Sequence, residues 1–128
     1  MKRGILLLCL SVFFFSCEKK QEGLTPISQE DFEKVYNSDQ KIQLVDVRTN
    51  AEYVQGFIEG AILIDIKQDN FLDQAKSLLN PEEPVYLYCK KGSRSERAGN
   101  ELIVTKEFKE VYYVTGGYTE WKQNQEQK

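Results

Sequence analysis

VYLYCKKGSRSERAGNEL, residues 85–102, contains an apolar run, a polar loop and a segment with helical spacing, in that order. The run VYLY has no charged residue, which is typical of a strand buried on both faces of a parallel sheet. Gly92 permits a tight turn in the loop. Ala98 and Leu102 then recur at the spacing of one helical face, so a helix is predicted from Ser93. A strand, a short loop and a helix in this order are typical of α/β proteins.

The remainder of the chain continues this alternation. Apolar runs predict further strands at residues 41–47, 61–66 and 111–114, with an additional candidate edge strand near 24–27. Helical spacing and end signals predict helices after Ser28, at residues 50–55, 69–79 and 93–108, and around Trp121. The tail after Trp121 is expected to fray. The whole pattern predicts an α/β fold: a mainly parallel sheet of four to five strands, flanked by helices on both faces.

Composition excludes several classes of function. With 128 residues, 41% of them apolar, the chain suits one compact domain with a real core. Its net charge of −3 lacks the basic excess of a nucleic-acid-binding protein, so no nucleic-acid partner is expected. Histidine is absent, which excludes a Ser-His-Asp triad, a Cys-His dyad and a His-based zinc site. Cys9, Cys17 and Cys89 share no motif or metal-site spacing, so neither a metal site nor a disulfide framework is expected.

Cys89 is the candidate catalytic residue because of its place in the predicted fold. It ends a predicted parallel strand and faces the start of a predicted helix. Ligands bind at this edge of open α/β sheets, and a helix N-terminus favours anions. Neighbouring cations favour thiolate over thiol. The loop residues expected to bind substrate around the sulfur are Lys90, Lys91, Gly92, Ser93, Arg94 and Ser95. The alternative is a buried thiol that acts only as a small apolar side chain.

The loop resembles that of rhodaneses, sulfurtransferases that hold a persulfide sulfur on a cysteine. Four residues separate Cys89 from Arg94, whereas phosphatases and arsenate reductases with this layout have one more. LVDVRTNAEYVQGFIEGAILIDI (44–66) resembles the amino-terminal rhodanese signature, and VYYVTGGYTEW (111–121) resembles the carboxy-terminal one. The three motifs occur in the family's order. Phe57 stands where the family usually has His, and we expect altered packing there with retained chemistry.

The resemblance implies a rhodanese-like fold and a sulfurtransferase activity that needs no metal or organic cofactor. Cys89 is implied to take sulfur from an anionic donor, thiosulfate or a persulfide, and to pass it to a thiol or to cyanide. Asp46 and Arg48 are implied to brace the loop; the alternative is a partly exposed ion pair of small energetic value. Arg94 either contacts substrate or caps carboxylates near Asp46. Two other functions stay open: a persulfide-carrying or partner-binding module with little turnover, and a phosphatase or arsenate-handling enzyme.

The first seventeen residues, MKRGILLLCLSVFFFSC, have the pattern of a signal peptide. Two cations precede an apolar run from Ile5 to Phe15, which is too short to span a bilayer comfortably. Ser16-Cys17 resembles the lipobox of bacterial lipoproteins, which implies cleavage before Cys17 and its lipidation. A plain secretory signal or an uncleaved anchor is the alternative. We expect residues 18–26 to be a flexible tether. Residues 27–128 would form the domain, a monomer anchored to a membrane of the bacterial envelope and facing the periplasm.

Overall fold

The computed structural model describes residues 22–128. The predicted signal peptide and the lipidation of Cys17 lie outside this range and stay predictions. Within residues 22–128, no helix is both long and apolar enough to cross a bilayer.

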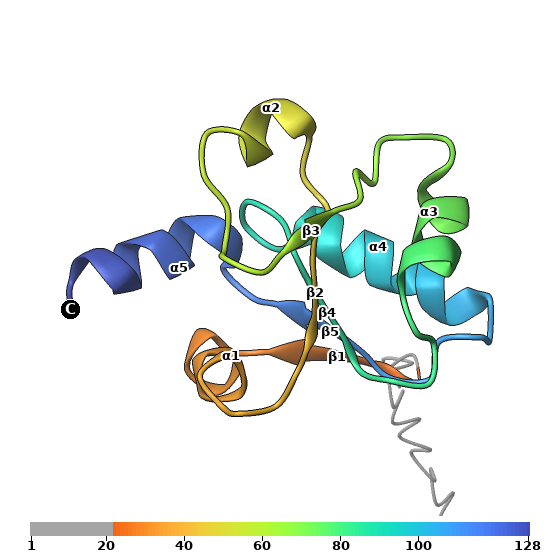
Figure 1. Cartoon of the computed structure of the whole chain (residues 1–128), viewed down its shortest axis with the longest axis horizontal. Helices are drawn as coiled ribbons and strands as arrows, with labels where there is room; N and C mark the ends of the chain where they lie inside the picture. Colours follow the sequence, from red (N-terminus) through yellow and green to blue (C-terminus); the bar gives the residue numbers. More distant parts are fainter. Residues whose placement is uncertain (1–21) are drawn as a thin grey trace, which may run out of the picture.

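Five parallel strands form one sheet, as the alternating pattern predicts (Figure 1). Their order across the sheet is β1-β5-β4-β2-β3. The strands are β1 (Leu24–Ile27), β2 (Gln43–Asp46), β3 (Ile62–Leu63), β4 (Val85–Tyr88) and β5 (Val111–Val114). β4 is the central strand and all four of its residues are buried, which explains why its sequence has no polar alternation.

Helices cover both faces of the sheet (Figure 1). They are α1 (Gln29–Tyr36), α2 (Asn50–Tyr53), α3 (Phe71–Leu78), α4 (Ser93–Val104) and α5 (Gly117–Glu126). One core lies under α3 and α4 and includes Phe71 and Leu102. The other core lies under α1 and α5 and is built around Phe32 and Trp121, whose ring centroids are 5.4 Å apart. The predicted α/β fold, a parallel sheet with helices on both faces, is therefore confirmed.

The start of α1 follows its predicted capping signal. The side chain of Ser28 accepts a hydrogen bond from the N–H of Asp31 at 3.1 Å, which satisfies one of the amides that a helix leaves unpaired at its beginning. The edge strand β1, only a candidate in the sequence, pairs with β5 along its whole length. Leu24, Thr25 and Pro26 therefore belong to the sheet, and the boundary predicted for the tether at residue 26 falls before Leu24.

Two helix ends differ from the prediction. The long helix α4 ends at Val104 rather than near residue 108. Lys106 adopts the left-handed backbone conformation (φ 61°), which stops the helix and lets Phe108 turn into the core. In contrast, α5 continues to Glu126, where a frayed tail was expected. Lys128 contacts Glu33 of α1, and this ion pair ties the end of the chain to the domain.

The parallel arrangement brings the candidate site together at one edge. The register places Asp46 of β2 beside Tyr88 of β4. Cys89 is the next residue after Tyr88 and therefore lies at the carboxyl edge of the sheet. The chain leaving β5 reaches the same edge at Thr115, before α5 begins. Loops from three strands therefore meet around Cys89, where open α/β sheets bind their ligands.

The packing of α4 gives a test of the fold. Leu102 is 0% exposed and Val104 is 61% exposed on the same helix. We expect Leu102→Ala to lower the free energy of unfolding by about 2–5 kcal/mol, because it leaves a cavity in the core. The matched change Val104→Ala should alter it by about 0.5 kcal/mol or less. Urea unfolding followed by circular dichroism measures both values, and equal effects of the two changes would contradict the assigned packing.

Candidate active site

Cys89 follows the central strand directly and lies against the start of α4. The residue is 1% exposed, and its Sγ accepts a hydrogen bond from the N–H of Gly92 at 3.0 Å. Gly92 is the residue that caps α4 and has φ 122°, a conformation that side-chain-bearing residues rarely adopt. The glycine therefore lets the loop turn back so that its amide points at the sulfur.

The carbonyl groups of the loop point the other way, toward α5. The N–H of Tyr118 donates to the carbonyl oxygen of Cys89 at 2.8 Å, and the N–H of Thr119 donates to that of Lys90 at 3.1 Å. The first N–H groups of a helix have no partner within that helix, so those of Tyr118 and Thr119 can donate to the loop. Because the carbonyls of Cys89 and Lys90 are held outward, the amides of the following residues can face the sulfur.

Gly117 makes this contact between α5 and the loop possible. A Cβ at this position would lie 2.5 Å from the carbonyl oxygen of Lys90 and 2.6 Å from that of Cys89. Its φ of +58° also favours glycine. The side chain of the buried Gln29 donates to the carbonyls of Thr115 and Gly117, at 2.8 and 3.0 Å, and fixes the turn from below.

The hydrogen-bond donors around Cys89, which form a cradle for its sulfur, determine the pKa of the thiol. Burial raises the pKa of the Cys89 thiol, because desolvation disfavours the thiolate. The hydroxyl and amide of Ser95 and the amides of Gly92 and Lys91 lower it by hydrogen bonding. The same hydroxyl lies 2.9 Å from the carbonyl oxygen of Gly92, so it has two acceptors within reach. The hydrogen bonds together outweigh burial, and the pKa lies below that of an ordinary thiol. The thiolate is the nucleophilic form of cysteine, so this environment activates the sulfur without a separate base.

The expected cations contribute less to this effect than the sequence suggests. Lys90, Lys91 and Ser93 are exposed at the surface of the loop. The leading causes of the lowered pKa of Cys89 are hydrogen bonds, and none of them is a lysine charge. The lowered pKa of Cys89 is therefore assigned to hydrogen bonds and not to the charges of the two lysines.

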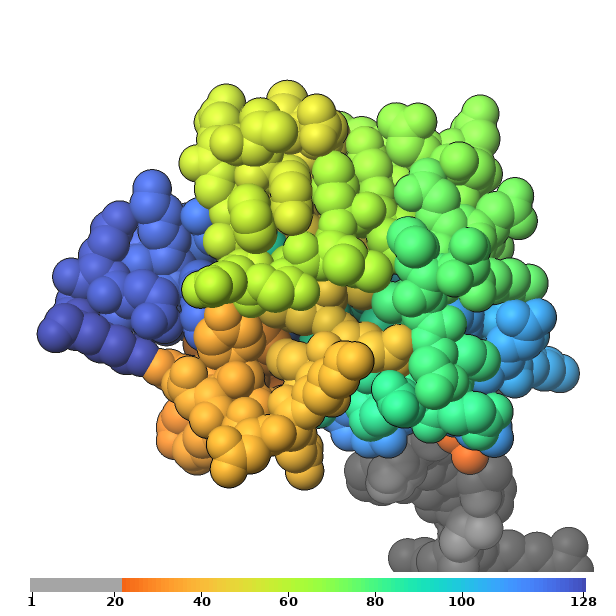
Figure 2. Space-filling view, viewed as in Figure 1, coloured from red at the N-terminus to blue at the C-terminus, as the bar shows by residue number. Residues whose placement is uncertain are grey.

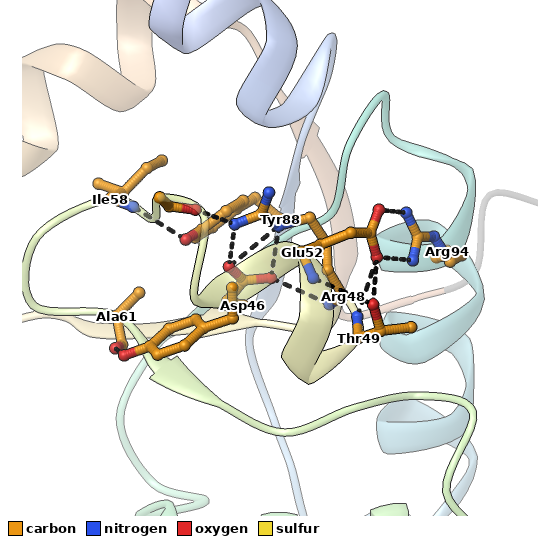
Figure 3. Close-up of polar contacts among 10 residues, drawn as sticks. Asp46, Arg48, Thr49, Glu52, Ile58, Ala61, Tyr88 and Arg94 are labelled. Carbon is orange, nitrogen blue, oxygen red and sulfur yellow. Dashed lines mark hydrogen bonds and ion pairs between the residues drawn. The ribbon is translucent and has the colours of Figure 1, made fainter.

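Arg94 makes a bidentate ion pair with Glu52. Its Nη1 and Nη2 donate to the two carboxylate oxygens of Glu52, each at 2.8 Å (Figure 3). The hydrogen bond from Arg94 is the largest cause that holds the pKa of Glu52 well below its usual range. Of the two roles that the sequence left open for Arg94, this is the capping of a carboxylate. The carboxylate belongs to Glu52 of α2, and Asp46 has a different partner.

Glu52 was not predicted as a site residue. It forms a capping box with Thr49: the N–H of Thr49 donates to Glu52 Oε2 at 3.0 Å, and the N–H of Glu52 donates to Thr49 Oγ1 at 3.3 Å. The spacing Thr49-x-x-Glu52 was a visible signal for the helix start. The same carboxylate thus caps α2 and holds Arg94, and it links α2 to the first turn of α4.

Asp46 and Arg48 form a fully buried ion pair beside Cys89. Arg48 Nη2 donates to Asp46 Oδ2 at 2.7 Å and to the carbonyl oxygen of Gly56 at 2.7 Å (Figure 3). Its guanidinium also lies 4.3 Å from the centre of the Tyr118 ring. This one side chain therefore joins β2, the loop that follows α2, and α5. Because both charges are buried, removing one partner would leave an uncompensated charge, which typically costs about 3–5 kcal/mol.

Phe57 occupies the edge of this arrangement. It is 44% exposed and stacks on the ring of Tyr53, with 4.2 Å between the ring centroids. The path of the loop is fixed by its neighbour instead: the N–H of Ile58 donates to the hydroxyl of Tyr88 at 3.0 Å.

Within residues 22–128, no group of three or more acidic, Cys or His side chains is placed to hold a metal ion.

Comparison with known proteins places this geometry in context. The family model described as "Rhodanese-like domain" matches residues 28–124. The chain is 37% identical over 90 residues to "Thiosulfate sulfurtransferase 18" of Arabidopsis thaliana, covering 62% of this chain and 65% of that protein. It is 33% identical over 125 residues to "Uncharacterized protein YqhL" of Bacillus subtilis, covering 94% of each. A rhodanese-like domain protein from Staphylococcus aureus superposes with a TM-score of 0.67 at 29% identity, over 76% of this chain and 90% of that one.

The hydrogen bonds to the sulfur predict a specific effect of Ser95. Ser95→Ala removes the hydroxyl that lowers the pKa of Cys89, so the pKa should rise and alkylation by iodoacetamide should require a higher pH. Ser93→Ala is the matched control, because Ser93 is exposed in the same turn. The pH dependence of alkylation, followed on the peptide that contains Cys89, gives the two midpoints. Identical midpoints in the two variants would show that Ser95 does not act on the sulfur.

The contact at Gly117 gives a second test. Gly117→Ala should push the carbonyls of Cys89 and Lys90 away from α5, lower stability by more than about 1 kcal/mol and raise the pKa of Cys89. Gly60→Ala is the control, since Gly60 also has positive φ (+89°) but a Cβ there would meet no atom within 4 Å. Thermal unfolding and the alkylation midpoint measure the two effects. A Gly60→Ala variant that raised the pKa of Cys89 equally would refute a specific role for the contact.

Proposed function

This chain belongs to the rhodanese-like domain family, and we propose that it is a sulfurtransferase that carries a sulfane sulfur as a persulfide on Cys89. The observation that carries the proposal is the cradle of amide and hydroxyl donors around one buried sulfur, which stabilises a sulfur anion without any base. A persulfide keeps negative charge at the same place, so the cradle that favours the thiolate also favours the intermediate.

The first half of the proposed cycle loads Cys89. Its thiolate attacks the outer sulfur of thiosulfate, a new sulfur–sulfur bond forms, and sulfite departs with the electrons of the broken bond. The exposed Lys90 and Lys91 attract the anionic donor to the loop. No oxidant is consumed, because the sulfane sulfur is transferred at its own oxidation level.

The second half returns the free enzyme. A thiolate or cyanide attacks the terminal sulfur of the persulfide and takes it, and the bonding electrons leave with Cys89 as thiolate. The same low pKa that makes Cys89 a nucleophile at the start makes it a good leaving group here. One set of hydrogen bonds therefore serves both halves of the cycle.

The arrangement supports sulfur transfer over phosphoryl transfer. A cysteine phosphatase needs a guanidinium that can clasp the oxygens of a tetrahedral substrate. Here both terminal nitrogens of Arg94 are engaged by Glu52, and only four residues separate Arg94 from Cys89. The donors nearest to Cys89 point at the sulfur itself.

We further propose that Cys17 is lipidated and holds the domain at a membrane of the bacterial envelope, facing the periplasm. The support is the sequence alone: an apolar run ending in Ser16-Cys17 and a polar stretch before β1. Attachment through the segment before Leu24 would leave the catalytic loop at the opposite edge of the sheet from the anchor, because the chain enters the sheet at the amino end of β1 and Cys89 lies at the carboxyl edge.

The decisive test is a thiosulfate:cyanide assay on the chain, combined with intact-mass measurement after thiosulfate alone. We expect thiocyanate formation and a mass gain of one sulfur atom on Cys89, and we expect Cys89→Ser to abolish both. Persulfide formation with little thiocyanate would favour the alternative of a sulfur-carrying module that hands its sulfur to a partner. If wild-type protein neither gained sulfur nor formed thiocyanate, the proposed function would be wrong.

A further inference from the structure

Gln29, the first residue of α1, is a buried polar side chain far from Cys89 in the sequence. Within residues 22–128, the other buried polar or charged side chains are Asp46, Arg48 and Ser95, and all three belong to the candidate active site. Figure 2 shows α1 (orange) beside the end of α5 (dark blue) on the left of the molecule. Burying a polar group costs free energy unless it is hydrogen-bonded, so the partners of Gln29 explain its presence.

The side-chain amide of Gln29 holds both ends of a two-glycine turn. Its Nε2 donates to the carbonyl oxygen of Thr115 at 2.8 Å and to that of Gly117 at 3.0 Å. Gly116 and Gly117, with φ of +75° and +58°, lead from β5 into α5. Glycine has a wide choice of backbone conformations, so a contact from outside the turn is needed to hold one of them. Gln29 supplies that contact.

The hydrogen bond to Gly117 leads directly to the catalytic loop. The carbonyl group of Gly117 and the N–H of Tyr118 belong to one planar peptide unit and point in opposite directions. Gln29 binds the carbonyl oxygen, and the N–H donates to the carbonyl oxygen of Cys89 at 2.8 Å. Hydrogen bonds in such a chain polarise and strengthen one another. A single peptide unit therefore connects the Gln29 side chain to the main chain of Cys89.

The oxygen of the same side chain indicates that the fold uses Gln29 for its donors. Gln29 Oε1 is buried and has no hydrogen-bond partner among residues 22–128. An unpaired buried oxygen destabilises a fold, and an apolar side chain of similar length, such as methionine, would avoid this cost. Turning the amide over would bring Oε1 against two carbonyl oxygens, which cannot donate to it. The two donated hydrogen bonds are therefore the reason for a glutamine at this position.

We propose that Gln29 is a positioning residue for Cys89, because it fixes the peptide unit between Gly117 and Tyr118 and thereby the catalytic loop. This inference rests on the proposed function and extends the site to α1. Gln29 does not touch the sulfur, and it acts through the start of α5. With the loop held in this way, the amide of Lys91 faces the sulfur. Loss of the Gln29 donors lets the glycine turn relax and weakens the hold on the loop.

The pH dependence of Cys89 alkylation tests the proposal on the full chain. Gln29→Met keeps the length of the side chain and removes both donors. We expect its alkylation midpoint to rise and its alkylation rate at pH 7 to fall roughly threefold, because less of the thiol is ionised. Phe71→Leu is the matched control, since Phe71 is buried in the core under α3 and has no contact with the turn. An unchanged midpoint in folded Gln29→Met, or an equal rise in Phe71→Leu, would overturn the proposal.

An NMR titration of the unaltered chain decides the question if Gln29→Met does not fold. We expect the side-chain NH₂ signals of Gln29 to shift with pH at the midpoint that alkylation gives for Cys89. The corresponding signals of Gln74, whose Nε2 donates to Asn70 at the start of α3, should not shift at that midpoint. Gln29 signals that stay constant while Cys89 titrates would refute the role.

The thiosulfate:cyanide assay links Gln29 to the reaction and separates this inference from the proposed function. For Gln29→Met we expect the acidic limb of the pH profile of kcat/KM to move to higher pH together with the alkylation midpoint. A profile that did not move would overturn the role of Gln29 in the reaction. A wild-type chain that formed no thiocyanate would refute the sulfurtransferase, whereas the alkylation midpoints would still decide whether Gln29 acts on Cys89.

Discussion

Two hydrogen bonds from the start of α5 hold the catalytic loop around Cys89. The amides of Tyr118 and Thr119 hold the carbonyls of Cys89 and Lys90 outward, at 2.8 and 3.1 Å. A peptide unit has its N–H and its carbonyl on opposite sides, so the amide of Lys91, which shares a peptide unit with the carbonyl of Lys90, turns inward to the sulfur. This donor to Cys89 is therefore held by the start of α5, which in turn requires glycine at position 117.

A second set of contacts holds α2 and the loop that follows it, on the other side of the site from α5. The buried pair of Asp46 and Arg48 fastens the loop after α2 to the sheet, and the pair of Glu52 and Arg94 fastens α2 to α4. The pair of Glu52 and Arg94 joins segments far apart in the sequence, and the pair of Asp46 and Arg48 buries its charges at the carboxyl edge of the sheet. Both arginines thus hold segments of the site together through carboxylates.

Much of this architecture could be predicted from the sequence, because it depends on local patterns. The unbroken apolar run before Cys89 predicts the central strand, and Gly92 predicts the turn that brings an amide to the sulfur. Ser28 gave a readable helix start. Family resemblance added Asp46 and Arg48 as bracing residues, and the structure shows the two as a buried ion pair that also holds the carbonyl of Gly56.

The parts that escaped prediction depend on contacts between distant segments. Glu52 and Arg94 are 42 residues apart, and nothing local marks them as partners. The source of the lowered pKa of Cys89 was assigned to nearby cations, because charge is visible in a sequence while the direction of an amide is not. The extension of α5 to Glu126 is accompanied by a contact of Lys128 with Glu33, again a distant pair.

The central claim is that hydrogen bonds, rather than the charges of surface lysines, stabilise the Cys89 thiolate. The most direct measurement is the pKa of Cys89 at low salt and at about 1 M salt, where the screening length falls from about 30 Å to about 3 Å. Buried hydrogen bonds are scarcely screened, so the account predicts a pKa that stays below that of an ordinary thiol and changes little with salt. A pKa that rose to the ordinary value of a thiol at high salt would contradict it.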